Sequence, residues 1–119
     1  MALERPDADG LIMDRSALFV SAQPVEKKIT APDGTEISVH VREVADSDWM
    51  RYVAVSASND PDVQGGARAF LISKGWVNAD GTPAATLEES ANLRTIVARQ
   101  LVARIIELNA PDRERKGNA

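Results

Sequence analysis

The side chains that could do nucleophilic chemistry are few, and the clearest pair lies on one predicted strand. Ser38 and His40 are two residues apart, and His40 is the only histidine in the chain. Residues at this spacing point to the same face of a strand, so a serine could lie beside a histidine base there. The sequence marks neither the orienting acid nor the oxyanion donors that such a site requires. His40 is therefore interpreted as an exposed strand histidine.

Two further segments carry residue types found at ligand sites. Asp60 and Asp62 offer oxygen ligands, but the residues after them lack the alternating ligands, central glycine and distal glutamate of a calcium loop. Asp60 is instead expected to cap a helix with Pro61 at its first position. Gly65-Gly66 is not preceded by a strand and has no Walker lysine pattern, which argues against nucleotide binding. We predict no catalytic, cofactor-binding or metal-binding residue, no cofactor and no enzymatic activity.

Length and composition narrow the classes of protein further. A chain of 119 residues suits one domain, and its two Trp, two Phe and one Tyr predict a thin core and self-association. The absence of cysteine excludes disulfides and thiolate metal sites and favours a reducing cytoplasm. A net charge of -4 argues against nucleic acid as the main partner. No apolar run is long enough to span a membrane.

The sequence predicts one folded region between two polar ends. Residues 1–12 have no hydrophobic period and are expected to be a disordered leader. Residues 111–119 form a charged tail without apolar anchors, which is also expected to be disordered. A single α+β domain is assigned to residues 13–110.

A β-hairpin is predicted over residues 25–44, because Pro32-Asp33-Gly34-Thr35 separates two β-prone runs. Ile37, Val39 and Val41 alternate with polar residues, so one face of the second strand is apolar. A lone hairpin is at best marginally stable in water. Its apolar face should therefore lie on helices or on another chain.

Two helices and a turn-rich link are predicted after the hairpin. The first helix is expected to be capped by Asp46 or Ser47 and to end near Ser58. The second extends from Asp60 to Gly75, with a glycine pair weakening its first turns. Residues 76–83 lack a helical period and form the link, which has room for one short extended piece.

The third predicted helix is the longest, extending without interruption from Thr86 to about Asn109. Thr86 and Glu89 form a capping-box pair at its start. Its apolar face is formed by Leu93, Val97, Leu101, Ile105 and Leu108, widened by Ile96 and Val102. The predicted fold is therefore an N-terminal β-hairpin packed on a small, mainly α-helical domain with a long C-terminal helix.

The order of these elements resembles the tail assembly chaperones of long-tailed, siphovirus-type bacteriophages. Four segments carry the resemblance, which covers the chain from about Ser16 to Asn109. They are Pro32 to Val44, Asp48-Trp49-Met50-Arg51-Tyr52, the link from Trp76 to Pro83, and Val102-Ala103-Arg104-Ile105-Ile106-Glu107-Leu108-Asn109. Turns and helix faces dominate these segments, so the resemblance is one of layout more than of motif.

The resemblance implies a chaperone that binds the tape measure protein and keeps it soluble and competent for tail-tube polymerisation. Such a protein acts in the host cytoplasm and is absent from the mature virion. The implied partners are the tape measure protein, the tail-tube protein, further copies of the chain and a longer form made by frameshifting near residues 116–119. The family transfers no catalytic residue and no residue-level binding motif, so no partner-binding residue is assigned.

Two other functions compete with this hypothesis. A minor tail protein or a head-tail completion protein would remain in the virion instead of leaving it. A small hydrolase using His40 is the enzyme alternative, and it is the least favoured because the sequence marks no complete catalytic site.

Overall fold

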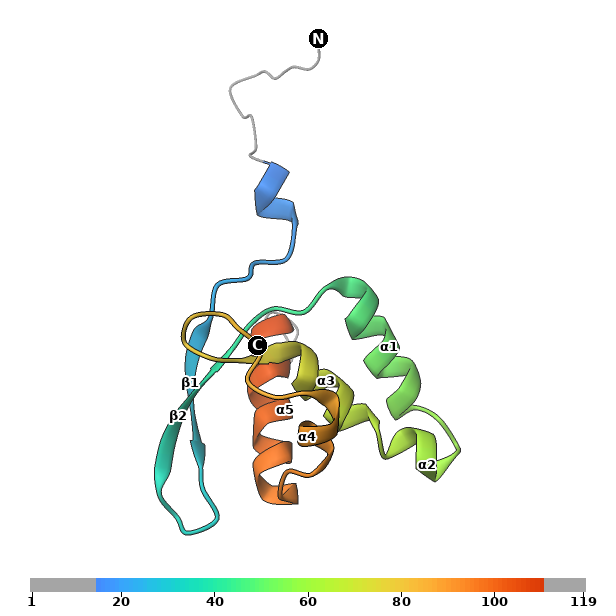
Figure 1. The fold of residues 1–119 in the computed structure, drawn as a ribbon. Helices are drawn as coiled ribbons and strands as arrows, with labels where there is room; N and C mark the ends of the chain where they lie inside the picture. The colour runs from blue at the N-terminus through green and yellow to red at the C-terminus, as the bar shows by residue number, and fades with distance from the viewer. Residues whose placement is uncertain (1–14, 111–119) are drawn as a thin grey trace, which may run out of the picture.

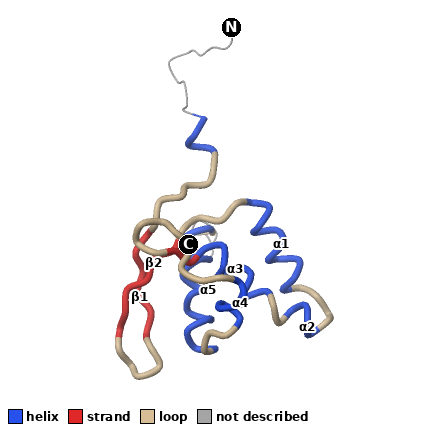
Figure 2. Tube along the Cα trace, viewed as in Figure 1, coloured by secondary structure: helices blue, strands red, loops and turns tan. Residues whose placement is uncertain are grey.

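The computed structural model describes residues 15–110, so the predicted leader (1–12) and charged tail (111–119) lie outside the described residues. The strands are β1 (Val25–Thr30), β2 (Glu36–Val41) and β3 (Trp76–Val77). The helices are α1 (Asp46–Ser56), α2 (Pro61–Gln64), α3 (Ala67–Gly75), α4 (Leu87–Ala91) and α5 (Thr95–Asn109), preceded by a 3-10 turn at Arg15–Leu18. This arrangement confirms the α+β class, and Figure 2 shows the long strands on one side of the helices.

The sheet is antiparallel in the order β1-β2-β3. In the hairpin, Val25 faces Val41 and Ile29 faces Ile37. The short extended piece allowed for in the link is a third strand: Trp76 and Val77 leave α3 and pair with the end of β2. The segment interpreted as a link therefore adds a third strand to the sheet, beside β2.

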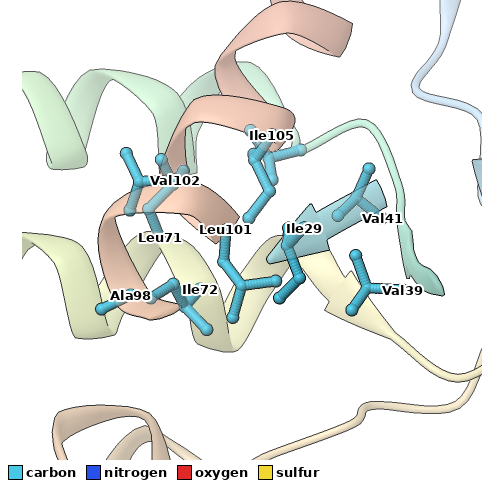
Figure 3. Close-up of a cluster of buried hydrophobic side chains, with 10 residues drawn as sticks. Ile29, Val39, Val41, Leu71, Ile72, Ala98, Leu101, Val102 and Ile105 are labelled. Carbon is cyan, nitrogen blue, oxygen red and sulfur yellow. The ribbon is translucent and has the colours of Figure 1, made fainter. Parts of the chain in front are cut away.

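The core lies between the hairpin and the helices α3 and α5 (Figure 3). Val39 and Val41 point from the hairpin into this core, as the alternation predicted, whereas Ile37 is exposed near the hairpin turn. The largest fully buried side chains are Leu71, Ile72, Leu101, Ile105 and Val41. Few aromatic rings contribute: Trp49, Tyr52 and Trp76 are only partly buried against the cluster.

The prediction of one helix from Thr86 to Asn109 was wrong, because the chain turns at residues 92–94 between α4 and α5. The capping box itself is present: Thr86 Oγ1 accepts from Glu89 N–H, and Glu89 Oε1 accepts from Thr86 N–H. At the turn, the N–H groups of Asn92 and Leu93 donate to carbonyls three residues back, and the α-helical ladder stops. The break lets α4 and α5 each contact α3, which a straight helix could not do along its whole length.

The second predicted helix is also interrupted. Gly65 and Gly66 separate α2 from α3, which fits the low helix propensity of glycine. The start of this region follows the prediction, since Asp60 Oδ1 accepts from Asp62 N–H at 2.9 Å and Pro61 is the first helical residue. At α1, by contrast, the N-cap is Ala45, and no side chain caps the helix.

Asn109 fastens the end of α5 to the chain between β2 and α1. Its Oδ1 accepts from Val44 N–H at 3.0 Å, and its Nδ2 donates to Ile105 O at 2.8 Å. Val44 is buried, so its N–H group would otherwise lack a partner, at a cost of about 1–3 kcal/mol. The last residue of α5 therefore fixes where α1 begins.

Two tight turns share one design, an aspartate followed by a glycine with positive φ. Gly34 has φ 93° and Gly81 has φ 91°, a region that glycine enters without strain. Asp33 Oδ1 accepts from Thr35 N–H at 2.9 Å. Asp80 Oδ1 accepts from Thr82 N–H at 3.0 Å and from its hydroxyl at 2.7 Å. These hydrogen bonds favour the ionised carboxylates and lower the pKa of both aspartates.

The two aspartates should make stability fall in acid. A pKa lower in the folded than in the unfolded chain stabilises the fold above the ordinary value of 3.8, and this contribution is lost as pH falls through the folded pKa. We expect the urea midpoint to be level above about pH 5 and to drop below about pH 4. In the double variant Asp33→Asn/Asp80→Asn, whose amide oxygens still accept hydrogen bonds, the drop should be shallower. Equal slopes in both proteins would contradict this assignment.

Candidate functional site

The structure does not join Ser38 and His40 into a catalytic pair. Lys28 Nζ donates to Ser38 Oγ at 2.6 Å, and Ser38 donates to Glu26 Oε2 at 2.8 Å. The Ser38 hydroxyl and the neighbouring Lys28 lower the pKa of Glu26. His40 is half-buried, not exposed as predicted, and it lies opposite Val77 in the pairing of β2 with β3. The serine thus belongs to a polar network on the outer face of the hairpin.

The other residues considered for chemistry have structural positions. Asp60 is the N-cap of α2, and Gly65 and Gly66 lie in the turn before α3. Across residues 15–110, no three His, Asp or Glu side chains gather in a way that could hold a metal ion. The same part of the chain contains no helix that is both long and apolar enough to cross a membrane.

Within residues 15–110, we consider three surfaces with exposed apolar side chains as candidates for protein contact. The first is the N-terminal arm, residues 15–20, where Leu18 is 68% and Phe19 61% exposed. The second and third lie on α1 and α5. The arm lies beside the start of α1, because its residues 17–20 line a hollow together with Asp46 and Trp49. The exposed faces of α1 and α5 lie apart, since α3 separates the two helices (Figure 1).

We define the α5 groove as the hollow of about 540 Å³ on the outer face of α5. Its lining residues are Thr95, Ile96, Arg99, Gln100, Ala103 and Arg104. Ile96 is 52% exposed, although the sequence pattern placed it on the core face. Its turn of α5 faces away from α3, and the core is filled from the same helix by Ala98, Leu101 and Val102.

Gln100 holds one wall of the α5 groove in place. Its Oε1 accepts from Thr30 N–H at 2.7 Å, and its Nε2 donates to Thr30 O at 2.8 Å and to Ile96 O at 3.0 Å. Thr30 ends β1, so the amide group satisfies both backbone groups of an edge-strand residue. The groove therefore has one side that is fixed before any partner arrives, which reduces the entropy lost on binding.

The walls of the α5 groove are basic, although the chain as a whole is acidic. Arg99 is exposed and makes no ion pair with any described residue, whereas Arg104 pairs with Glu107 at 2.8 Å. No acidic residue lines the groove. A spacing of five residues turns the second arginine about 140° from the first. The two charges therefore flank the hollow and do not form a stripe.

The α1 stripe is the exposed face of α1 that carries Asp46, Met50, Val53 and Ala57. These positions are four, three and four residues apart, which aligns them along one side of a helix. Met50 is 57% and Val53 41% exposed, and no residue of α1 is fully buried. The opposite side of α1 packs on α3, where Arg51 lies 5.2 Å above the Phe70 ring.

Comparison with known proteins finds similarity to a solved structure but to no family model and no curated protein. Among solved structures, the tail assembly chaperone of bacteriophage HK97 is similar, with a TM-score of 0.53 and 20% sequence identity. The similarity covers 71% of this chain and 85% of that chain. At this identity the likeness shows the fold, so the chain has a fold like that of a phage tail assembly chaperone.

Proposed function

We propose that this chain is a tail assembly chaperone of a long-tailed, siphovirus-type bacteriophage. The observation that carries the proposal is the fold shared with the HK97 tail assembly chaperone over most of that chain. In this role the protein binds the tape measure protein and keeps it soluble and competent for polymerisation of the tail tube around it. It acts in the host cytoplasm and is absent from the mature virion.

The exposed apolar surfaces support a role in binding proteins. The proposed partners are the tape measure protein, the tail-tube protein, a longer frameshifted form of the chain and further copies of the chain itself. Nucleic acid and membranes are not among them. Many modest contacts along one long client give avidity through effective concentration. Each contact is still weak enough to be displaced one copy at a time when tail-tube protein arrives.

The first test is co-expression with the tape measure protein of the same phage. We expect the soluble fraction of the tape measure protein to rise several-fold, because its apolar surface is covered before it aggregates. The measurement is the ratio of soluble to pelleted tape measure protein. A small acidic protein of unrelated fold, expressed to the same level, is the control. An equal soluble fraction with both proteins would contradict the chaperone role.

Purified virions separate this proposal from a minor tail or head-tail completion protein. Mass spectrometry of mature tails should find the chain far below stoichiometric amounts, whereas a structural component would be present in every tail. The variant His40→Ala should assemble tails as the wild type does, since the Ser38 hydroxyl bonds to Lys28 and Glu26. Loss of assembly by a folded His40→Ala protein would revive the hydrolase hypothesis.

A further inference from the structure

The α5 groove has the geometry of an acceptor for a side chain from another helix. Ile96, Arg99, Gln100 and Ala103 occupy positions i, i+3, i+4 and i+7 of α5. Four residues at these positions form the hole that takes one knob in knobs-into-holes packing. Ala103 supplies the depth of the hole because its side chain is a single methyl group. An apolar side chain projecting from a partner helix therefore fits this groove better than a flat surface does.

The same chain displays a helix face with matching chemistry, the α1 stripe. Met50 projects from it as an unbranched apolar side chain, and Asp46 lies one helical turn earlier on the same face. Methionine adapts well to irregular hollows. A methionine knob with a carboxylate one turn away complements a hole whose rim carries Arg99, an arginine that pairs with no acid among residues 15–110.

Charge selects the α1 stripe over the other apolar surfaces. Two α5 grooves facing one another would bring arginines together without an acid between them, and like charges in contact are unfavourable. The N-terminal arm carries Arg15, whose guanidinium lies 5.6 Å from the Phe19 ring, so the arm would also bring positive charge to Arg99. Of the residues that define the three surfaces, Asp46 of the α1 stripe is the only acidic one, and it also lines the hollow beside the arm.

The positions of the two surfaces prevent them from meeting within one molecule. The packing order is α1 on α3, α3 on α5, and α5 on β1, as Figure 1 shows. The groove lies on the part of α5 that Gln100 ties to β1, on the far side of α5 from α1. The α1 stripe can therefore reach an α5 groove only in a second copy.

We propose that the α1 stripe of one copy packs into the α5 groove of another, with Met50 as the knob and Asp46 paired with Arg99. The inference rests on the self-association included in the proposed function and names the surfaces that make it. The contact is heterologous, so each pair of copies leaves one groove and one stripe free for further copies. The assembly then grows until it closes into a ring or until no free copies remain.

Sedimentation velocity of the full chain over a range of concentrations tests the proposal. The wild type should shift to larger species as concentration rises. The groove variant, Ile96→Glu/Arg99→Glu, and the stripe variant, Asp46→Lys/Met50→Lys, should need at least about tenfold more protein for the same shift. All four positions are exposed, so both variants should keep the wild-type circular dichroism spectrum. Leu87→Glu, an equally exposed change on α4, is the matched control and should assemble normally.

Mixing the two variants is the decisive step. The groove variant keeps an intact stripe and the stripe variant keeps an intact groove, so a mixture should form species that contain both chains. A mixture that stays monomeric, a variant that assembles as the wild type does, or a monomeric wild type at every concentration would overturn the proposal. The chaperone function has its own readout: tape measure solubility that persists with a monomeric wild type would overturn this contact and leave the proposed function standing.

Discussion

Replacing Leu101 by alanine is expected to lower the free energy of unfolding by about 2–5 kcal/mol. Leu101 is fully buried at the centre of the cluster that joins the hairpin to α3 and α5. Removing its branched end leaves a cavity that the surrounding side chains can fill only in part. A small domain has a total stability of about 5–15 kcal/mol, so the variant should lose a large share of it. The urea midpoint, followed by circular dichroism, measures the loss.

The matched control is Ile96→Ala, five residues earlier on the same helix. Ile96 is about half exposed and lines the α5 groove, so its loss should change stability by no more than about 0.5 kcal/mol. The pair separates the two faces of α5, one of which stabilises the domain while the other is free for a partner. Equal destabilisation by the two substitutions would contradict this division.

The parts of the fold that the sequence predicted well are those governed by short-range rules. The turn residues Asp33 and Gly34, the cap at Asp60 and the capping box at Thr86 each depend on neighbours within three residues, and each is present. The alternation in β2 also fixed which face is buried, because a strand has only two faces. At these positions, residues within three places along the chain were enough to predict the observed turn or cap.

The parts that the sequence missed depend on contacts between distant segments. The period of apolar residues continues through Leu93, so the pattern gave no sign that the helix would break between α4 and α5. The break is favoured by the packing of both helices on α3. Trp76 and Val77 form a strand only because the end of β2 lies beside them. Two residues carry too weak a β signal to predict more than a short extended piece.

The candidate site was missed for a related reason. Ile96 fits the apolar period of the core face, and only the direction in which α5 lies on α3 shows that it points outward. The spacing from Ile96 to Ala103 is a full heptad, a signal of a second helix contact that could have been found in the sequence. The arginines that flank the groove are five residues apart, a spacing typical of neither a stripe nor a patch, so the sequence does not mark them as a site.

Gly75→Ala should also be strongly destabilising, by about 1–3 kcal/mol. A Cβ atom at this position would lie 2.9 Å from Ile105 Cδ1 and 3.0 Å from both Cγ1 and Cγ2. Three atoms of one branched side chain are blocked together, and Ile105 is fully buried, so no single rotation relieves the overlap. The urea midpoint measures the cost. Gly66→Ala is the matched control, since its nearest neighbour, Val63 O, would be at an ordinary 3.6 Å.

A double variant shows whether the cost arises from this contact alone. Ile105→Ala should destabilise by about 2–5 kcal/mol because it leaves a cavity beside Gly75. In Gly75→Ala/Ile105→Ala the new methyl group enters that cavity, so the double variant should be more stable than the sum of the single effects predicts, by about 0.5–3 kcal/mol. Strict additivity would place the strain elsewhere, for instance in the hydrogen bond from Arg42 N–H to Gly75 O at 2.9 Å. A double variant more stable than the sum would show that the close approach of α3 to α5 requires glycine at the end of α3. The same approach places β3, which follows Gly75 directly, beside the hairpin.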